Sequence, residues 1–115
     1  MTIAANIMVG LVALLHVYFL VLEMFLWDKP RGRRVFGTTP EYATASKTLA
    51  ANQGLYNGFL AAGLIWGFFA GDPVKIFFLA CVIVAGVFGA ATVNLRILWV
   101  QAVPAAIALA LVLIS

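Results

Sequence analysis

The sequence predicts an all-α integral membrane protein, a four-helix bundle within the bilayer. Of its 115 residues, 65% are hydrophobic and only 10% are charged, whereas soluble domains average about half apolar and a quarter charged. The apolar residues form four stretches close to the roughly 20 residues that cross a bilayer. These stretches, residues 3–27, 45–70, 74–93 and 97–115, make one transmembrane domain that covers residues 1–115.

The first apolar stretch differs from a secretory signal peptide. No Lys or Arg precedes it, and it is longer than the roughly 7–15 apolar residues of a signal peptide's central region. We therefore expect it to remain in the protein as a membrane span.

Turn-forming residues separate the later stretches. Gly71-Asp72-Pro73 ends the second stretch, because this combination does not continue a helix. Only Asn94-Leu95-Arg96 joins the third and fourth stretches. These two are therefore expected to form a tight antiparallel hairpin.

The first connection, residues 28–44, is the one long loop. We expect Pro30, Gly32 and Gly37 to break any helix there. Thr38-Thr39-Pro40-Glu41 has the pattern of a helix start, with a Thr cap, Pro in the first position and an acid in the first turn. The second helix is therefore expected to begin near Pro40.

Basic residues are unequally distributed between the connections. The side that holds the first and third connections carries Lys29, Arg31, Arg33, Arg34, Lys47 and Arg96. The opposite side carries only Lys75. The positive-inside rule then predicts a cytoplasmic first loop and both termini outside. Because the basic residues cluster in one short loop and form no extended face, nucleic acid is not an expected partner.

Polar side chains interrupt the first two stretches. In hydrocarbon an unpartnered polar group costs several kcal/mol, so polar residues within a span usually mark a functional site. They are His16, Tyr18 and Glu23 in the first stretch and Asn52, Gln53, Tyr56 and Asn57 in the second.

The polar residues of the two stretches are expected at overlapping depths. With a rise of about 1.5 Å per residue, Glu23 lies roughly 6 Å deep and His16 roughly 16 Å. Asn52 and Gln53 lie roughly 11 Å deep, and the Tyr56–Asn57 pair roughly 17 Å. If the two polar stripes face each other, they form a pocket open toward the basic loop.

The predicted pocket suits a small amphipathic or lipophilic ligand. Its expected ligand-binding residues are His16, Glu23, Asn52, Gln53, Tyr56 and Asn57. Arg33 and Arg34 are expected to attract an anionic group or a lipid phosphate. His16 and Glu23 are the candidates for proton exchange, but no catalytic motif identifies catalytic residues.

Each polar residue also has a purely structural interpretation. Asn, Gln and Tyr often join helices without binding anything, at about 0.6 kcal/mol a pair. His16 is equally interpreted as a core histidine, and Glu23 as the partner of a cation in the loop. Gly54 and Gly58 allow close helix packing within one copy or between copies. Cys81 is the single cysteine, so neither a disulfide within the chain nor a Cys/His metal site is expected.

Several strings resemble a known family. They are LEMFLW at 22–27, RRVFG at 33–37, AANQGLYNGFLAAG at 50–63, FGAAT at 88–92 and VQAVPA at 100–105. Over essentially its whole length the chain is similar to a family of small bacterial membrane proteins catalogued as domain of unknown function thirteen-zero-four. The resemblance implies four spans in the bacterial inner membrane and no established activity.

A more distant resemblance is to the membrane-associated eicosanoid and glutathione enzymes, which are trimers of four-helix subunits. Their second helix carries Arg-Ala-x-x-Asn-x-x-Glu-Asn and binds glutathione. Laid on this chain, the pattern retains only Asn57, with Leu49 in place of Arg, Gln53 in place of the first Asn and Tyr56 in place of Glu. Glutathione is therefore a possible cofactor by this resemblance alone.

Three classes of function compete on the sequence. The first is an oligomeric membrane protein that binds an amphipathic ligand in the predicted pocket. The second is a glutathione-dependent membrane enzyme, and the third is a small transporter or a structural membrane subunit. A homo-oligomer is the expected assembly. The ligand, the oligomer number and the pathway do not follow from the residues.

Overall fold

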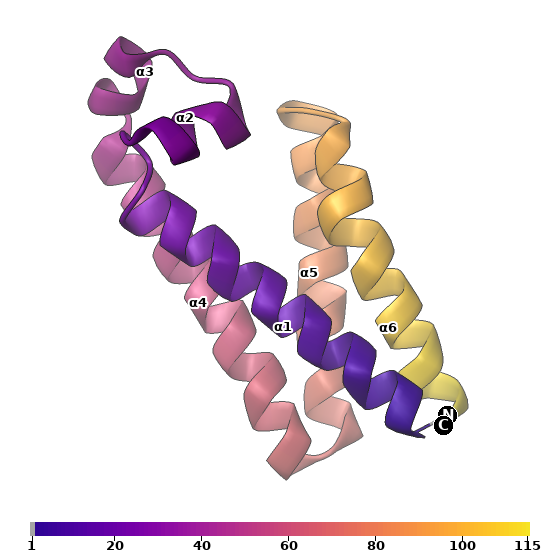
Figure 1. Ribbon diagram of the computed structural model, residues 1–115. Helices are drawn as coiled ribbons and strands as arrows, with labels where there is room; N and C mark the ends of the chain where they lie inside the picture. The colour runs from indigo at the N-terminus through magenta and orange to yellow at the C-terminus, as the bar shows by residue number, and fades with distance from the viewer. Residues whose placement is uncertain (1) are drawn as a thin grey trace. The chain divides into compact units, whose positions relative to one another are not determined.

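The computed structural model describes residues 2–115, and every element within them is a helix (Figure 1). The chain order is α1 (Thr2–Met24), α2 (Pro30–Phe36), α3 (Pro40–Ala45), α4 (Lys47–Ala70), α5 (Asp72–Thr92), the π-helix η1 (Leu98–Ala102) and α6 (Val103–Ile114). The all-α class is thus confirmed. Helices occupy all four expected stretches, with bounds that differ by at most three residues.

Two of the described helices, α1 and α5, are long and apolar enough to cross a membrane. The apolar segment Leu98–Ile114 is shorter. The helix α4 has 24 residues, but its amide side chains lower its mean hydropathy.

The chain forms two compact units, and α1 and α4 contribute to both. The terminal unit contains the residues up to Leu14 together with Leu60–Ser115. The central unit contains Leu15–Phe59.

The core of the terminal unit is built from small and branched apolar side chains. It contains Ala5, Val9, Val12, Ala13, Leu64, Leu79, Val82, Ala105, Ala108 and Val112. The helix α5 packs against η1 and α6 as the expected hairpin. Gly86 makes this packing close, because an added Cβ there would lie 2.7 Å from the backbone nitrogen of Ala102.

The last helix begins with a π turn next to Pro104. The N–H of Val103 bonds to the carbonyl of Leu98, five residues earlier. Pro104 has no N–H for the carbonyl of Val100, and its ring clashes with that carbonyl in a regular helix. A π turn, with its wider ring, relieves this clash.

The first connection contains more helix than the sequence predicts. Pro30 begins α2, because proline suits the first helical position, where the N–H has no partner. Gly32 lies inside this helix and is buried. The expectation that these two residues break the helix is therefore wrong. Gly37, with φ of 67°, ends α2 in the left-handed conformation.

A helix begins at Pro40, as the cap pattern predicts, but the expectation that it is the second long helix is wrong. The Thr39 hydroxyl accepts a hydrogen bond from the N–H of Tyr42 at 3.2 Å, with Glu41 in the first turn. This helix, α3, is short and ends at Ser46, whose hydroxyl donates to the carbonyl of Tyr42. The long helix α4 begins separately, at Lys47.

Candidate functional site

The candidate site lies in the central unit, where α1 and α4 pack through glycines. A Cβ added to Gly54 would lie 2.5 Å from Cγ of Met24, and one added to Gly58 would lie 2.8 Å from Cδ1 of Leu20. Two helix backbones approach most closely where side chains are smallest. The glycine pair therefore determines which side of α4 faces α1.

One pair of predicted site residues meets across these two helices. The side-chain amide nitrogen of Asn57 donates a hydrogen bond to Oε1 of Glu23. Both side chains are half-buried. Asn57 lies three residues beyond Gly54, at the edge of the contact face, where its amide reaches past the glycines to the carboxyl group.

The other polar residues of α4 stay exposed. Asn52 and Tyr56 lie two residues before and two residues after Gly54, and each is therefore about 200° from Gly54 round the helix. Both point away from the face that contacts α1, and 53% of Tyr56 is exposed. Gln53 is exposed as well. The sequence predicts that the polar stripes of the two helices face each other, but Asn52, Gln53 and Tyr56 do not face α1 in this way. Leu49, aligned with the arginine of the glutathione-binding pattern, is also exposed.

His16 is completely buried. Its imidazole meets the ring of Phe19 edge-on, with ring centroids 5.5 Å apart. Complete burial against an aromatic ring agrees with the interpretation of His16 as a core residue.

The basic segment lies against the ends of the two long helices. Nη2 of Arg31 donates to the Tyr18 hydroxyl on α1 at 2.9 Å. Arg33 is half-buried, and its Nε has no hydrogen-bond partner within residues 2–115, while Arg34 is exposed. The sequence alone points to Arg33 and Arg34 for anion binding, but the residue that contacts α1 is Arg31. Arg31 reaches Tyr18 only because α2 folds back toward α1, and the local sequence does not predict this fold.

Three contacts hold α2 in this position. The ring of Trp27 packs at a tilt against the ring of Phe36, with centroids 4.9 Å apart. Its indole N–H donates to the Ser46 hydroxyl at 3.0 Å. Gly32 packs so tightly that an added Cβ would lie 1.9 Å from the carbonyl oxygen of Leu26.

An ion pair joins the start of α4 to the residues just before α2. Nζ of Lys47 lies 3.1 Å from Oδ2 of Asp28. The hydrogen bond from Lys47 holds the pKa of the Asp28 carboxyl below its usual range.

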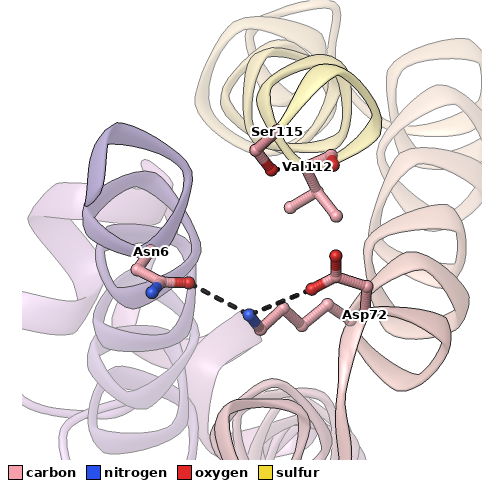
Figure 2. A network of polar contacts seen from close by, with 5 residues as sticks. Asn6, Asp72, Val112 and Ser115 are labelled. Carbon is pink, nitrogen blue, oxygen red and sulfur yellow. Dashed lines mark hydrogen bonds and ion pairs between the residues drawn. The ribbon is translucent and has the colours of Figure 1, made fainter. Parts of the chain in front are cut away.

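A second polar cluster lies in the terminal unit and surrounds a buried lysine. Nζ of Lys75 lies 3.0 Å from Oδ1 of Asn6 and 3.3 Å from Oδ1 of Asp72. Figure 2 shows Asn6 and Asp72 converging from two helices near the end of α6 at Ser115. Lys75 is only 8% exposed, and its ammonium lies 5.4 Å from the ring centroid of Phe68.

The sequence analysis treated Lys75 only as a single cation on the side opposite the basic loop. The i,i+3 spacing of Asp72 and Lys75 was the one signal of a pair. Nothing in the spacing pointed to Asn6, because it lies 69 residues away in the chain. The cluster holds the start of α1 to the start of α5 within the terminal unit.

Comparison with known proteins supplies the family. Residues 10–113 match the family described as "Protein of unknown function (DUF1304)". The chain belongs to this family. The resemblance stated from the residue strings is thereby confirmed at the level of the family, and the family description assigns this DUF1304 chain no activity.

A relative is similar over most of both chains. The "Uncharacterized protein YpaA" of Lactococcus lactis subsp. lactis (strain IL1403) is 36% identical over 106 residues, which cover 88% of this chain and 89% of the relative. No solved structure matches the chain.

Proposed function

We propose that this chain is an integral membrane protein that holds a small anionic amphiphile at the cytoplasmic ends of α1 and α4. In this proposal α1, α4, α5 and the η1–α6 segment cross the bacterial inner membrane. Both termini lie outside, and the basic segment around α2 lies in the cytoplasm. The headgroup binds near Arg31, and the apolar part of the ligand lies along the helices.

Exposed apolar surface supports the membrane part of the proposal. In the most apolar 18-residue windows of α1 and α5, only 28% and 22% of the residues are buried. The core helix of a soluble protein is mostly buried, whereas a membrane helix keeps apolar side chains outward toward lipid. The unequal distribution of Lys and Arg supports the orientation.

The contact between Arg31 and Tyr18 carries the headgroup part of the proposal. It places a guanidinium group against the side of an otherwise apolar helix. In the proposed bilayer Tyr18 lies roughly 14 Å along α1 from Trp27, so the Arg31 side chain reaches inward to it from the cytoplasmic boundary. Basic residues at that boundary attract anionic lipids. Arg33 and Arg34 follow within the same short helix and add positive charge.

The pair of Glu23 and Asn57 adds polar surface to the same part of the central unit as the arginines. The Asn57 amide holds the Glu23 carboxyl group in place, so that its remaining lone pairs are available to hydroxyl groups of a bound molecule. Gln53 lies one helical turn from Asn57 and is exposed. The proposal therefore retains these three of the expected ligand-binding residues and places His16 behind them in the core.

Fluorescence quenching of Trp27 tests the headgroup site. Trp66 and Trp99 are replaced by Phe, so that only Trp27 reports, and the protein is placed in neutral detergent. Brominated phosphatidylglycerol, an anionic lipid, is expected to quench at lower concentration than brominated phosphatidylcholine. Because each basic residue contributes about 1 kcal/mol, Arg31→Gln is expected to weaken phosphatidylglycerol binding about fivefold.

Arg96→Gln is the matched control, since Arg96 is an exposed cation outside the central unit. It is expected to leave quenching unchanged. Equal affinity for both lipids, or equal effects of the two substitutions, would contradict the headgroup site. Extraction of the protein from membranes by alkaline carbonate would contradict the membrane part.

A structural subunit role is the second candidate function. It is favoured by Asn52 and Tyr56, which are exposed on the side of α4 away from α1. Self-assembly through this side would make the chain a repeating unit of a homo-oligomer in the membrane.

A further inference from the structure

One side of α4 carries a regular row of exposed residues. The row, called the α4 seam, consists of Leu49, Asn52, Tyr56 and Phe59. Leu49 is 66% exposed, Tyr56 is 53% exposed and Phe59 is 57% exposed, and Asn52 is exposed with them. The spacing along the seam is three, four and three residues.

This spacing is the one by which two helices pack along their length. Residues that alternate three and four apart stay on one stripe and interlock with the same stripe of a second helix. In this chain the stripe lies opposite the glycines that contact α1. The contacts within the central unit therefore leave the α4 seam open.

The amide of Asn52 is the central feature of the seam. Within residues 2–115 its side chain has no hydrogen-bond partner. In the proposed membrane it lies roughly 11 Å deep, within the hydrocarbon, where an unpaired amide costs several kcal/mol. Lipid tails offer no hydrogen bond to it.

We infer that copies of this chain associate side by side in the membrane through the α4 seam, with Asn52 of one copy against Asn52 of the next. The inference rests on the membrane insertion in the proposed function. A second copy fits this surface because an amide both donates and accepts hydrogen bonds, so that identical side chains satisfy each other. An Asn in such a stripe also determines the register and the number of helices that associate.

Symmetry brings the identical residues to the same depth. All copies have the same orientation in the membrane, so the axis that relates them runs along the membrane normal. The α4 helices of neighbouring copies are then parallel, and Leu49, Asn52, Tyr56 and Phe59 each meet near their own counterparts. The apolar and aromatic side chains at both ends of the seam cover the central amide pair.

Cysteine cross-linking in native membranes tests this arrangement. Cys81 is first replaced by Ala, and single cysteines are then introduced as Tyr56→Cys or Leu55→Cys. The two positions are adjacent and similarly deep, but Leu55, which is 42% exposed, lies about 100° away round the helix. Under mild oxidation Tyr56→Cys is expected to give a disulfide-linked product of twice the chain's mass, and Leu55→Cys is expected to give little.

A second variant tests the amide itself. Asn52→Val is made in the Cys81→Ala protein with Tyr56 retained, and the dissociation constant of the oligomer is measured in detergent by energy transfer between copies labelled at Thr2→Cys, outside the α4 seam. It is expected to rise about threefold, as an interhelical hydrogen bond of ~0.6 kcal/mol predicts. Gln53→Val, which alters an exposed amide beside the seam, is expected to change it less.

The possible results separate the inference from the proposed function. A product of another mass, equal cross-linking at both positions, or none at Tyr56→Cys would overturn the α4 seam as a self-association surface. A protein that stays in the membrane after carbonate extraction but remains monomeric would overturn only the seam. A protein released by carbonate would overturn both.

Discussion

Individual polar residues in this chain are stabilised in pairs. Glu23 and Asn57 belong to different helices and contact each other in the central unit, while Lys75 contacts Asn6 and Asp72 in the terminal unit. Glu23 and Lys75 each contact an amide, and Lys75 contacts the Asp72 carboxylate as well. At Glu23, loss of the amide leaves a half-buried carboxyl group unsatisfied, which costs more than the net value of the hydrogen bond.

A double-substitution cycle measures the cost of leaving the Glu23 carboxyl group without its partner. Asn57→Leu leaves the carboxyl group of Glu23 without its amide donor and is expected to lower the free energy of unfolding by about 1 kcal/mol, the lower end for a half-buried group. Adding Glu23→Leu to Asn57→Leu is expected to restore most of that loss, because no polar group is then left unpaired. Unfolding in mixed detergent micelles, followed by circular dichroism, measures both.

If the losses in unfolding free energy simply added in the double variant, the coupling between Glu23 and Asn57 would be contradicted. Additive losses would mean that the two side chains contribute to stability independently, through packing with other residues.

Helices in this protein pack where glycine removes the side chain. Gly54 and Gly58 bring α4 against α1 in the central unit, and Gly86 brings α5 against η1 in the terminal unit. The sequence pattern of small residues predicts close packing but not the partner. The structure shows that these three glycines serve contacts within a single copy, and that the α4 seam is not used by them.

Two glycine-to-alanine substitutions distinguish a packed glycine from a free one. A Cβ on Gly86 would lie 2.8 Å from Cβ of Ala102, whereas the nearest atom to a Cβ on Gly10 is Cζ of Phe68 at 4.0 Å. Gly86→Ala is expected to destabilise the protein by about 1–2 kcal/mol, because the helices must separate. Gly10→Ala is expected to be neutral or to stabilise by up to ~1 kcal/mol, through helix propensity.

Thermal unfolding of the two variants in the same detergent measures the difference. If Gly86→Ala were as stable as Gly10→Ala, α5 and η1 would not approach as closely as the structure shows.

The whole molecule has a strong asymmetry of charge. The segment from Lys29 to Arg34 holds four of its seven Lys and Arg residues, whereas Lys75, in the first turn of α5, stands far from them in the sequence. In the proposed membrane this asymmetry orients the chain. It also places the headgroup site and the α4 seam in the cytoplasmic half.

Labelling of single cysteines checks the orientation. In a Cys81→Ala background, Thr2→Cys is expected to react with a membrane-impermeant maleimide added to intact spheroplasts. Glu41→Cys, in α3, is expected to react only after permeabilisation. Neutralising Lys29, Arg31, Arg33 and Arg34 with Gln is expected to make part of the protein insert in the opposite orientation.

An unchanged labelling pattern in the neutralised variant would show that these charges do not orient the chain. Labelling of Glu41→Cys from outside in the original background would reverse the proposed topology.

The positions of the helices followed from the sequence, but some details of the first connection did not. Apolar stretches and the pattern at Pro40 predicted helix positions because they reflect local chemistry. Pro30 and Gly32 were misinterpreted as helix breakers. Proline both ends and begins helices, and Gly32 is helical because it packs against the backbone of Leu26.

The sequence by itself determined the helical class, the family and the residues worth testing, because composition, spacing and residue type are local properties of the chain. Only the tertiary structure decided how those residues are paired. It joined Asn57 to Glu23, left Asn52 and Tyr56 exposed and brought Arg31 to Tyr18. The reason is that the side of α4 facing α1 is chosen by the smallest side chains, so the glycines occupy the contact and the larger polar groups turn outward.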